Sequence, residues 1–370
     1  MIYLDYAANT PVDKRVLDKF NEITLKYCGN PNSLHEAGIS AKKEIDDASK
    51  LIADYFNTDK NNIIYTSGSS EANNLVIKGI CERYKDIGKH IIISEVEHSS
   101  IVAPCNYLTS KGYEVSIIPL NSDGQVDLEV LKKEIRRDTV LVSICSVDSE
   151  LGTIQPINDI VKIVKNNSNA IIHTDATQAI GKVNIDYSGV DFLTFASHKF
   201  FGLNGIGALI NFNNKKLVPL IHGGKSTTIY RSGTPVTANC VALAYALELA
   251  TKNLSEKLNY IKTLKEYIIN ELGTISGIHI NTPSNSIVST INFSIYNADK
   301  IVSELYNRGI CVSKQSACSL GTSPSKSVLA ITRSEDLARN SIRVSLSHIT
   351  TMKELEEFIK VLKEIINENN

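Results

Sequence analysis

The chain has 370 residues, of which 42% are hydrophobic and 21% charged, a composition typical of a folded protein with a buried core. Its length exceeds that of a typical single domain, so we expect one large and one smaller domain. The formal net charge of −1 excludes the strongly basic proteins that bind nucleic acids or anionic membranes by charge.

The amino-terminal residues 1–15 lack a basic start followed by a long apolar core, and no stretch approaches the roughly 18 apolar residues that span a membrane. We therefore expect a cytoplasmic protein with no membrane contact. The 7 cysteines form no CxxC pair and their number is odd. This pattern predicts neither a disulfide framework nor a metal site.

A helix is predicted first, because five apolar side chains recur at helical spacing within residues 35–56: Ala41, Ile45, Ala48, Ile52 and Tyr55. Six short Ile- and Val-rich runs then follow, NIIYT (62–66), HIIISE (90–95), EVSIIPL (114–120), TVLVSICS (139–146), AIIHTD (170–175) and DFLTFAS (191–197). Helix-like stretches separate several of them. This alternation predicts a parallel sheet with helices on both faces.

The carboxyl-terminal third begins with a long helical tract over 236–272. We expect it to lead into a second domain. In that domain three segments are predicted strands and one is the closing helix: 290–296, 309–313, 341–347 and 351–368. Two polar segments, 222–235 and 314–327, are predicted loops.

Polar residues that directly follow the predicted strands are candidates for a site, because ligands of parallel sheets bind beyond the carboxyl ends of the strands. TSGSSE (66–71) is either an ordinary serine-capped turn or a turn that accepts a phosphate. Asp175 is either a helix cap or the partner of a buried cation. Lys199 is either a solvated strand end or a desolvated lysine able to form a Schiff base. Together they match the needs of pyridoxal phosphate: a phosphate anchor, a partner for the pyridine nitrogen and an amine.

Nine short motifs in a fixed order extend this interpretation over nearly the whole chain: YLDYAANTP (3–11), GNPNSLH (29–35), TSGSSEANN (66–74), EHSS (97–100), HTDATQAIGK (173–182), SHK (197–199), RSGTP (231–235), SAC (316–318) and SIRVSL (341–346). By these motifs the chain resembles the cysteine desulfurases, pyridoxal-phosphate enzymes of the class V aminotransferase group. The resemblance implies a PLP-dependent transferase type I fold of the α/β class. A large domain (13–255) would hold a mostly parallel seven-stranded sheet. Residues 1–12 and 256–370 would form a small α+β domain.

The resemblance also implies roles for individual residues. Lys199 would carry the cofactor pyridoxal 5'-phosphate, Asp175 would keep its ring nitrogen protonated, and His98 would stack on the ring and assist proton transfer. The remaining cofactor contacts would come from Ser69, Ser70, Ser149, Gln178, Ser197, His198 and Thr234. Thr234 would reach the phosphate of the other subunit in a homodimer.

The substrate and sulfur roles come from the same resemblance. Arg343 and Asn30 would bind the α-carboxylate of L-cysteine, a task that suits the planar guanidinium fork; the alternative for Arg343 is a surface ion pair. Cys318 lies in a polar segment, where a thiol can ionise and reach a substrate. Its thiolate would take the sulfur, leaving alanine and a persulfide for an acceptor such as an iron–sulfur scaffold or a tRNA-thiolation enzyme.

Several positions depart from the usual family pattern, and they cluster at the cofactor: Asp148-Ser149-Glu150, Ala196-Ser197, Gly202-Leu203-Asn204-Gly205, Gly223-Gly224-Lys225-Ser226-Thr227 and Gln315. Each lost hydrogen bond would be worth about 0.5–1.5 kcal/mol. Two alternatives therefore stay open. The first is a specialised paralogue that keeps the cofactor, such as a selenocysteine lyase or an enzyme with aminotransferase-like or cysteine-lyase activity, in which Cys318 is dispensable. The second is a partner-docking protein without turnover.

Overall fold

The computed structural model describes residues 1–314 and 323–369. Gln315 and Cys318 lie outside these residues. The strands are β1 (Ile2–Tyr3), β2 (Ile63–Thr66), β3 (His90–Ser94), β4 (Glu114–Ile118), β5 (Thr139–Ser143), β6 (Ile171–Asp175), β7 (Phe192–Ala196), β8 (Gly207–Asn211), β9 (His279–Ile280), β10 (Thr290–Ser294), β11 (Ile310–Cys311) and β12 (Ser341–Ser345).

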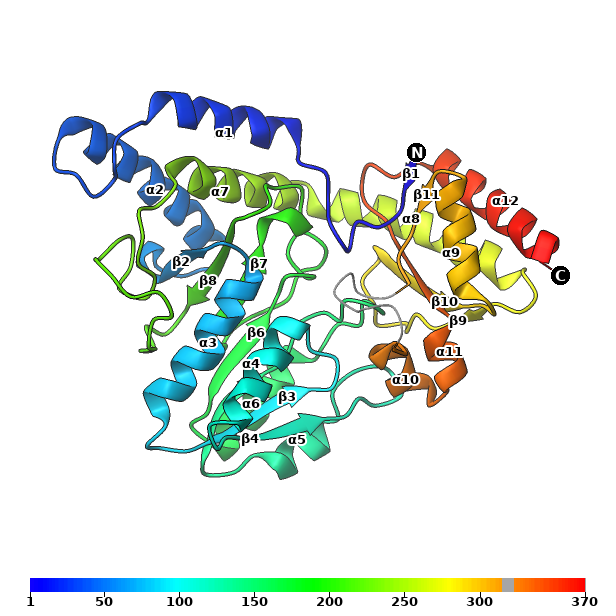
Figure 1. Cartoon of the computed structure of the whole chain (residues 1–370), viewed down its shortest axis with the longest axis horizontal. Coiled ribbons are helices and arrows are strands. Elements are labelled where there is room, and N and C mark those ends of the chain that lie inside the picture. Colours follow the sequence, from blue (N-terminus) through cyan, green and yellow to red (C-terminus); the bar gives the residue numbers. More distant parts are fainter. Residues whose placement is uncertain (315–322, 370) are drawn as a thin grey trace.

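The α-helices are α1 (Lys14–Lys26), α2 (Glu36–Tyr55), α3 (Ser69–Tyr84), α4 (Ser99–Thr109), α5 (Leu128–Glu134), α6 (Ile157–Asn167), α7 (Thr237–Thr251), α8 (Leu254–Gly273), α9 (Ala298–Asn307), α10 (Lys326–Thr332), α11 (Glu335–Arg339) and α12 (Met352–Asn369). Short 3₁₀ turns follow Asp59 and Ala196, as η1 (Lys60–Asn62) and η2 (Ser197–Lys199). The structure thus alternates strands and helices through the first two thirds of the chain (Figure 1).

The main sheet has seven strands in the order β2-β8-β7-β6-β5-β3-β4. Its strands run parallel except β8, which is antiparallel to both β2 and β7. All five residues of β3, β5, β6 and β7 are buried, as expected of strands covered by helices on both faces. The predicted mostly parallel seven-stranded sheet and the α/β fold are confirmed.

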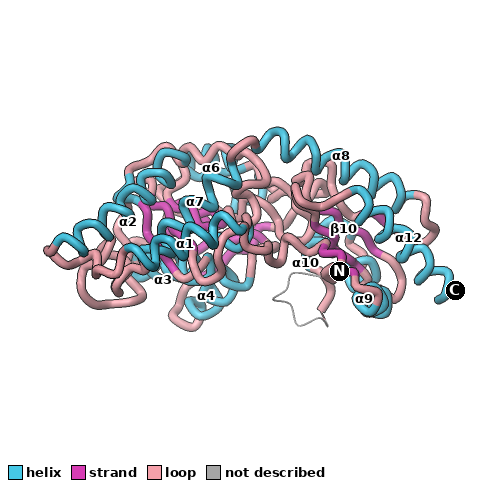
Figure 2. Tube along the Cα trace, turned by 90° about the horizontal axis from the view of Figure 1, so that it is seen from above, coloured by secondary structure: helices cyan, strands magenta, loops and turns pink. Residues whose placement is uncertain are grey.

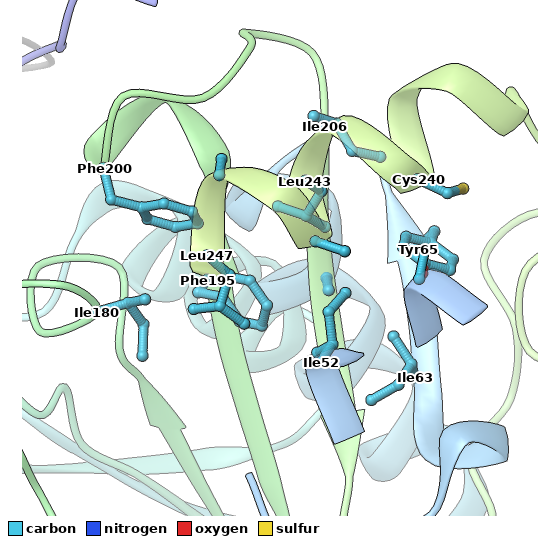
Figure 3. Close-up of a cluster of buried hydrophobic side chains, with 14 of the residues drawn as sticks. Ile52, Ile63, Tyr65, Ile180, Phe195, Phe200, Ile206, Cys240, Leu243 and Leu247 are labelled. Atoms are coloured by element: carbon cyan, nitrogen blue, oxygen red, sulfur yellow. The ribbon is translucent and has the colours of Figure 1, made fainter. Parts of the chain in front are cut away.

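Helices cover both faces of this sheet, and the alternation of side chains along β3 shows how. Ile91 and Ile93 pack in the cluster that contains α3 and α4, whereas Ile92 packs in the cluster that contains α5 and α6. A third cluster lies between α2, α7 and the sheet, where Phe195 of β7 meets Leu243 and Leu247 of α7 (Figure 3). The sheet is therefore held rigidly, and so are its strand ends.

The predicted helical tract over 236–272 is wrong in one respect, because it is two helices. Asn253 adopts a left-handed conformation with φ of 54° and separates α7 from α8. The Lys257 ammonium donates to the carbonyl oxygens of Leu249 and Ala250 at 2.6 and 3.3 Å. These bonds satisfy carbonyls that the end of α7 leaves without helical partners.

A second group of elements lies at the end of the molecule that carries both termini (Figures 1 and 2). It contains the antiparallel sheet β12-β10-β9 and the parallel pair β1-β11. Its own core joins Leu4 to side chains of α8, α9 and α12, including Leu264, Leu305 and Phe358. The division at 12/13 and 255/256 stays a prediction, and α8 runs across the second boundary.

Candidate active site

Lys199 lies at the carboxyl end of β7, in the turn η2. Its Nζ donates to the carbonyl oxygens of Ala7 and Ala8 at 3.0 and 2.5 Å. The same amino-terminal segment is fastened to the turn by Thr10, whose backbone N–H and hydroxyl both donate to the His198 carbonyl oxygen at 2.9 Å. The YLDYAANTP segment therefore covers the lysine and holds its ammonium group in place.

Asp175 ends β6, the parallel neighbour of β7, so its carboxylate belongs to the same edge of the sheet as Lys199. It is buried, and both of its oxygens are occupied. Oδ1 accepts from the Thr177 backbone N–H at 2.9 Å, and Oδ2 accepts from Asn73 Nδ2 at 2.7 Å. These two hydrogen bonds fix the orientation of the carboxylate.

His98 caps the amino-terminus of α4, and its Nδ1 accepts from the Ser100 backbone N–H at 3.1 Å. Burial lowers the pKa of this ring below its usual value, Asp175 opposes that shift and Lys199 adds to it. The aspartate, the lysine and the histidine are thus close enough to act on one another. The structure brings together the three residues that the sequence singled out from separate motifs.

Gln178 lies in the turn after β6, three residues past Asp175, and links Lys199 to Lys182. Its Nε2 donates to the Ala7 carbonyl oxygen at 2.9 Å, the same oxygen that accepts from Lys199. Its Oε1 accepts from Lys182 Nζ at 2.6 Å. Burial, followed by the charges of Lys199 and Arg343, lowers the pKa of Lys182 well below its usual value.

Ser69 and Ser70 form the first turn of α3, after Gly68 with φ of 154°. The first N–H groups of a helix have no helical partners and can receive an anion. A Cβ added to Gly207 of β8 would lie 2.8 Å from the Gly68 Cα, so only glycine fits beside this turn. Glu71, one residue on, accepts from Arg231 Nε at 3.0 Å and ties the predicted loop 222–235 to the turn.

Ser197 and His198 precede Lys199 in the turn η2. Burial, together with the charges of Lys199 and Lys182, lowers the pKa of His198 to about 4. The Ser197 hydroxyl is fully buried and has no hydrogen-bond partner in the described part of the chain. A Cβ on Gly202 would collide with the Ser197 Oγ, which explains why glycine follows the lysine turn at this position.

Arg343 of β12 is 1% exposed. Its Nη2 forms an ion pair with Asp5 Oδ1 at 2.9 Å, and its Nη1 donates to the Ser149 carbonyl oxygen at 2.8 Å. Arg343 is therefore not a surface residue, whereas the side chain of its partner Asp5 is 17% exposed. Ser149 itself faces a cavity of about 300 Å³ that His98 also lines.

Thr234 and Asn30, two other predicted site residues, lie at the surface of the described part of the chain. Thr234 is exposed and lines a cavity of about 110 Å³ with Thr66 and Ser67, next to the turn before α3. Asn30 is exposed and accepts from the Asn32 backbone N–H at 3.0 Å. Cys318 lies outside the described residues.

Two residues of this site were not predicted from the sequence. Asn73 is fully buried and donates from Nδ2 to Asp175 and, at 2.9 Å, to the Ser100 hydroxyl. Ser100 Oγ in turn lies 2.8 Å from His98 Nδ1. Helical spacing was the available signal, because Asn73 lies three and four residues after Ser70 and Ser69 and so shares their face of α3.

A group of acidic side chains adjoins the site on the α10 side. Glu97 Oε1 accepts from the Ser94 hydroxyl at 2.6 Å and the Cys145 N–H at 2.8 Å, and burial raises its pKa to about 8. Burial also raises the pKa of Asp148 to about 6, with Glu150 adding to the shift. Asp148 accepts from the Ser327 hydroxyl at 2.9 Å, and Glu150 accepts from the Ser325 hydroxyl. These bonds join the loop after β5 to the start of α10.

The residues present fit a polar cofactor with a phosphate. Eight buried side-chain atoms lack a hydrogen-bond partner in the described chain, and two of them, Asn73 Oδ1 and Thr177 Oγ1, belong to residues that hydrogen-bond to Asp175. Unpartnered buried atoms cost free energy and are rare in folded proteins, so these two fit a polar ligand beside Asp175. Lys199, Asp175 and the first turn of α3 supply the amine, the carboxylate and the anion site.

No group of three or more His, Cys, Asp or Glu side chains able to hold a metal ion occurs within residues 1–314 and 323–369. In the same part of the chain, no helix is long and apolar enough to cross a membrane.

Comparison with known proteins identifies the same family in sequence and in structure. The family model described as "Aminotransferase class-V" matches residues 2–358. A protein named cysteine desulfurase IscS from Dictyoglomus turgidum is 38% identical over 99% of this chain and 94% of its own length. The mitochondrial cysteine desulfurase of Arabidopsis thaliana is 35% identical over 97% of this chain and 81% of its own length.

Solved structures resemble the fold over the same extent. A NifS-like protein superimposes with a TM-score of 0.93 at 33% identity, covering 99% of both chains. A structure described as SspA in complex with cysteine has a TM-score of 0.82 at 33% identity, covering 95% of this chain and 100% of that one.

Proposed function

Because this chain belongs to the cysteine desulfurases of the class V aminotransferase family, we propose that it uses pyridoxal 5'-phosphate to convert L-cysteine to L-alanine and passes the sulfur through Cys318. The observation that carries the proposal is the meeting of Lys199, Asp175 and His98 at one edge of the main sheet. When bound, pyridoxal phosphate supplies a ring that takes up electron density from the substrate.

Lys199 and Asp175 have complementary roles in this proposal. The Asp175 carboxylate, held by Asn73 and Thr177, keeps a proton on the pyridine nitrogen by its negative charge. Lys199 would hold the cofactor through Nζ, and the same amine would move a proton at the substrate Cα. The carbonyls of Ala7 and Ala8 orient that amine.

The other cofactor residues bind and orient. Ser69, Ser70, Ser197 and His198 hold the phosphate, and Thr234 completes that site for the partner subunit of a homodimer. Gln178 and Ser149 would contact the ring hydroxyl.

Arg343 binds the substrate carboxylate, assisted by Asn30. Its unpartnered Nε supports this role, because a carboxylate that reached it would complete the hydrogen bonding of the guanidinium group. Asp5 competes for the same guanidinium at 2.9 Å. We therefore expect the substrate to bind by partly displacing Asp5 from Arg343.

Sulfur transfer is assigned to Cys318. Its thiolate attacks the substrate sulfur, an S–S bond forms and the Cβ–S bond breaks. The electron pair of that bond stays with the carbon fragment, which takes up protons to become alanine. The persulfide on Cys318 is then delivered to a protein acceptor in the cytoplasm, an iron–sulfur scaffold or a tRNA-thiolation enzyme.

The test is a paired assay on wild type and Cys318→Ala, with Cys28→Ala as the control because Cys28 is an exposed thiol elsewhere. We expect all three proteins to be yellow after addition of pyridoxal phosphate, and Cys318→Ala alone to lose alanine and sulfide release from L-cysteine by at least about 10³-fold. Full alanine release by Cys318→Ala would replace the desulfurase mechanism with a lyase. A colourless wild type would leave only the partner-docking function.

A further inference from the structure

The Gln178 side-chain amide has one defined orientation, because its two polar ends face partners of opposite kind. The Ala7 carbonyl oxygen can only accept a hydrogen bond, so the amide atom 2.9 Å from it has to be Nε2. Gln178 Oε1 then lies 2.6 Å from Lys182 Nζ. A lysine amine donates whether or not it carries its charge. The reversed amide would place two acceptors together at Ala7 and two donors together at Lys182.

This amide is a neighbour of Lys199. The Ala7 carbonyl oxygen that accepts from Gln178 Nε2 also accepts from Lys199 Nζ, at 3.0 Å. Nε2 carries two N–H groups, and the bond to Ala7 uses one of them. The second N–H is left for a ligand. Lys182 is therefore joined through the Gln178 amide to the oxygen that also holds Lys199.

The turn that carries both residues is rigid. The Ala179 carbonyl oxygen accepts from the backbone N–H groups of Lys182 and Val183, at 3.0 and 3.1 Å. Gly181 lies inside this turn with φ of 73°, a left-handed conformation that favours glycine. A Cβ at Gly181 would lie 3.0 Å from the Ala250 Cβ of α7, so the helix packs closely on the turn. The Lys182 backbone is thus held where its amine meets the amide.

The surroundings of Lys182 do not favour a lysine for its charge. Its side chain is half-buried, and among residues 1–314 and 323–369 its amine bonds to Gln178 and forms no ion pair with a carboxylate. Burial, followed by the charges of Lys199 and Arg343, lowers its pKa well below the usual value. Burying such a group costs free energy that an apolar side chain of the same length would not. The hydrogen bond to Gln178 is what the amine contributes here.

We propose that Lys182 is a positioning residue that fixes the Gln178 amide, so that an N–H donor is held ready beside Lys199. The inference rests on the proposed function, in which this N–H would contact the ring hydroxyl of pyridoxal phosphate. Lys182 itself touches neither cofactor nor substrate. Without Lys182, Oε1 loses its donor and the amide is free to turn. An N–H that is not held in place binds an acceptor less tightly, because binding must first restore its orientation.

The first test is a double-mutant cycle on the affinity for pyridoxal phosphate, read from its visible absorption band. Lys182→Met keeps the length of the side chain and removes the amine, and we expect it to weaken binding by about 3- to 10-fold. In a Gln178→Ala background the same change has no further effect, because Lys182 acts only through the amide. The exposed Lys133→Met is the matched control and keeps the wild-type affinity. Additive effects in the double variant, or unchanged affinity in Lys182→Met, would overturn the proposal.

The second test needs no cofactor, so it separates this inference from the proposed function. The bond from Gln178 to Ala7 helps to fasten the amino-terminal segment, in which the Thr10 N–H donates to the His198 carbonyl oxygen at 2.9 Å. Hydrogen exchange of the Thr10 N–H reports how firmly the segment is held. In the full chain without cofactor we expect Lys182→Met to speed this exchange by about 3- to 10-fold and Lys133→Met to leave it unchanged.

The outcomes of the two tests differ. A wild-type protein that stays colourless with added pyridoxal phosphate would contradict the cofactor assignment, and faster exchange in Lys182→Met would still support the positioning of Gln178. Exchange at the wild-type rate in Lys182→Met would show that Lys182 does not hold the amide, whatever the colour of the protein.

Discussion

The two sides of the active site are built differently. The side around Asp175, Asn73 and His98 is built from β6 of the main sheet and from the helices α3 and α4 that pack on it. Its hydrogen bonds join these residues to each other, with Ser100 between Asn73 and His98. The side around Arg343 comes from β12, and its guanidinium reaches to Asp5 and to the Ser149 carbonyl. The first side is fixed by its own sheet, whereas the second exists only when separate segments pack together.

This contrast predicts different consequences for mutation. Changes on the Asp175 side remove chemistry and leave the fold intact. Changes on the Arg343 side also weaken the attachment between segments. The four predictions below test that difference, from the largest expected effect to the smallest.

Replacing Lys199 tests the first side. Lys199→Ala removes the amine that binds the cofactor, and we expect alanine formation to fall by at least about 10³-fold. The melting temperature of the protein without added cofactor stays close to that of wild type, because the bonds from Lys199 to the carbonyls of Ala7 and Ala8 are two among several that fasten the amino-terminal segment, which Thr10 also joins to the His198 carbonyl oxygen. The exposed Lys216→Ala is the control. A variant that is unfolded at 25 °C would contradict the contrast.

Replacing Arg343 tests the second side. Arg343→Ala leaves Asp5 without its buried partner, and such losses cost about 3–5 kcal/mol of unfolding free energy. We expect a value toward the lower end, because the Asp5 side chain is 17% exposed. Urea unfolding measures it. In Asp5→Asn/Arg343→Ala the cost is smaller than the sum of the single changes, and strict additivity would show that the pair is not coupled.

Glu97 gives a pH-dependent test on the Asp175 side. Its carboxyl is protonated in the folded protein up to about pH 8, whereas the unfolded chain ionises near 4.5. The folded state therefore binds more protons in this window, and the Glu97 contribution to stability falls as pH rises through it. Glu97→Gln keeps an acceptor for Ser94 and Cys145 and cannot ionise.

The measurement is urea unfolding of wild type and Glu97→Gln at pH 5 and pH 8. We expect the variant to gain up to about 3 kcal/mol relative to wild type between the two pH values, from about 1.4 kcal/mol per pH unit. A difference that is the same at both pH values would refute the raised pKa of Glu97.

The smallest effect concerns the attachment of α10. Ser327→Ala removes the hydroxyl that donates to Asp148 at 2.9 Å, a loss worth about 1 kcal/mol of unfolding free energy. Lys326→Ala is the matched control, because Lys326 is exposed and lies beside Ser327 in the same helix. Equal stability of the two variants would show that this bond does not join α10 to the loop after β5.

The sequence predicted the sheet well because its information is local. A strand buried on both faces has to be a continuous apolar run, and five of the six predicted runs form fully buried strands: β2, β3, β5, β6 and β7. The sixth run forms the edge strand β4, in which only Ile118 is buried. The seventh strand, β8, follows the lysine turn and was included in the predicted strand number without its own run. The break at Asn253 was missed, since apolar spacing continues across it.

The sequence by itself determined which residues lie at the strand ends, because apolar period and the positions of Asp175 and Lys199 are properties of short segments. Only the tertiary structure decided which atoms those residues face. Asn73 and Asp175 are 102 positions apart, and Arg343 and Asp5 are 338 apart. The packing of distant segments determines such partners. A buried polar atom needs a hydrogen-bond donor or acceptor, and the residues next to it in the sequence often do not supply one.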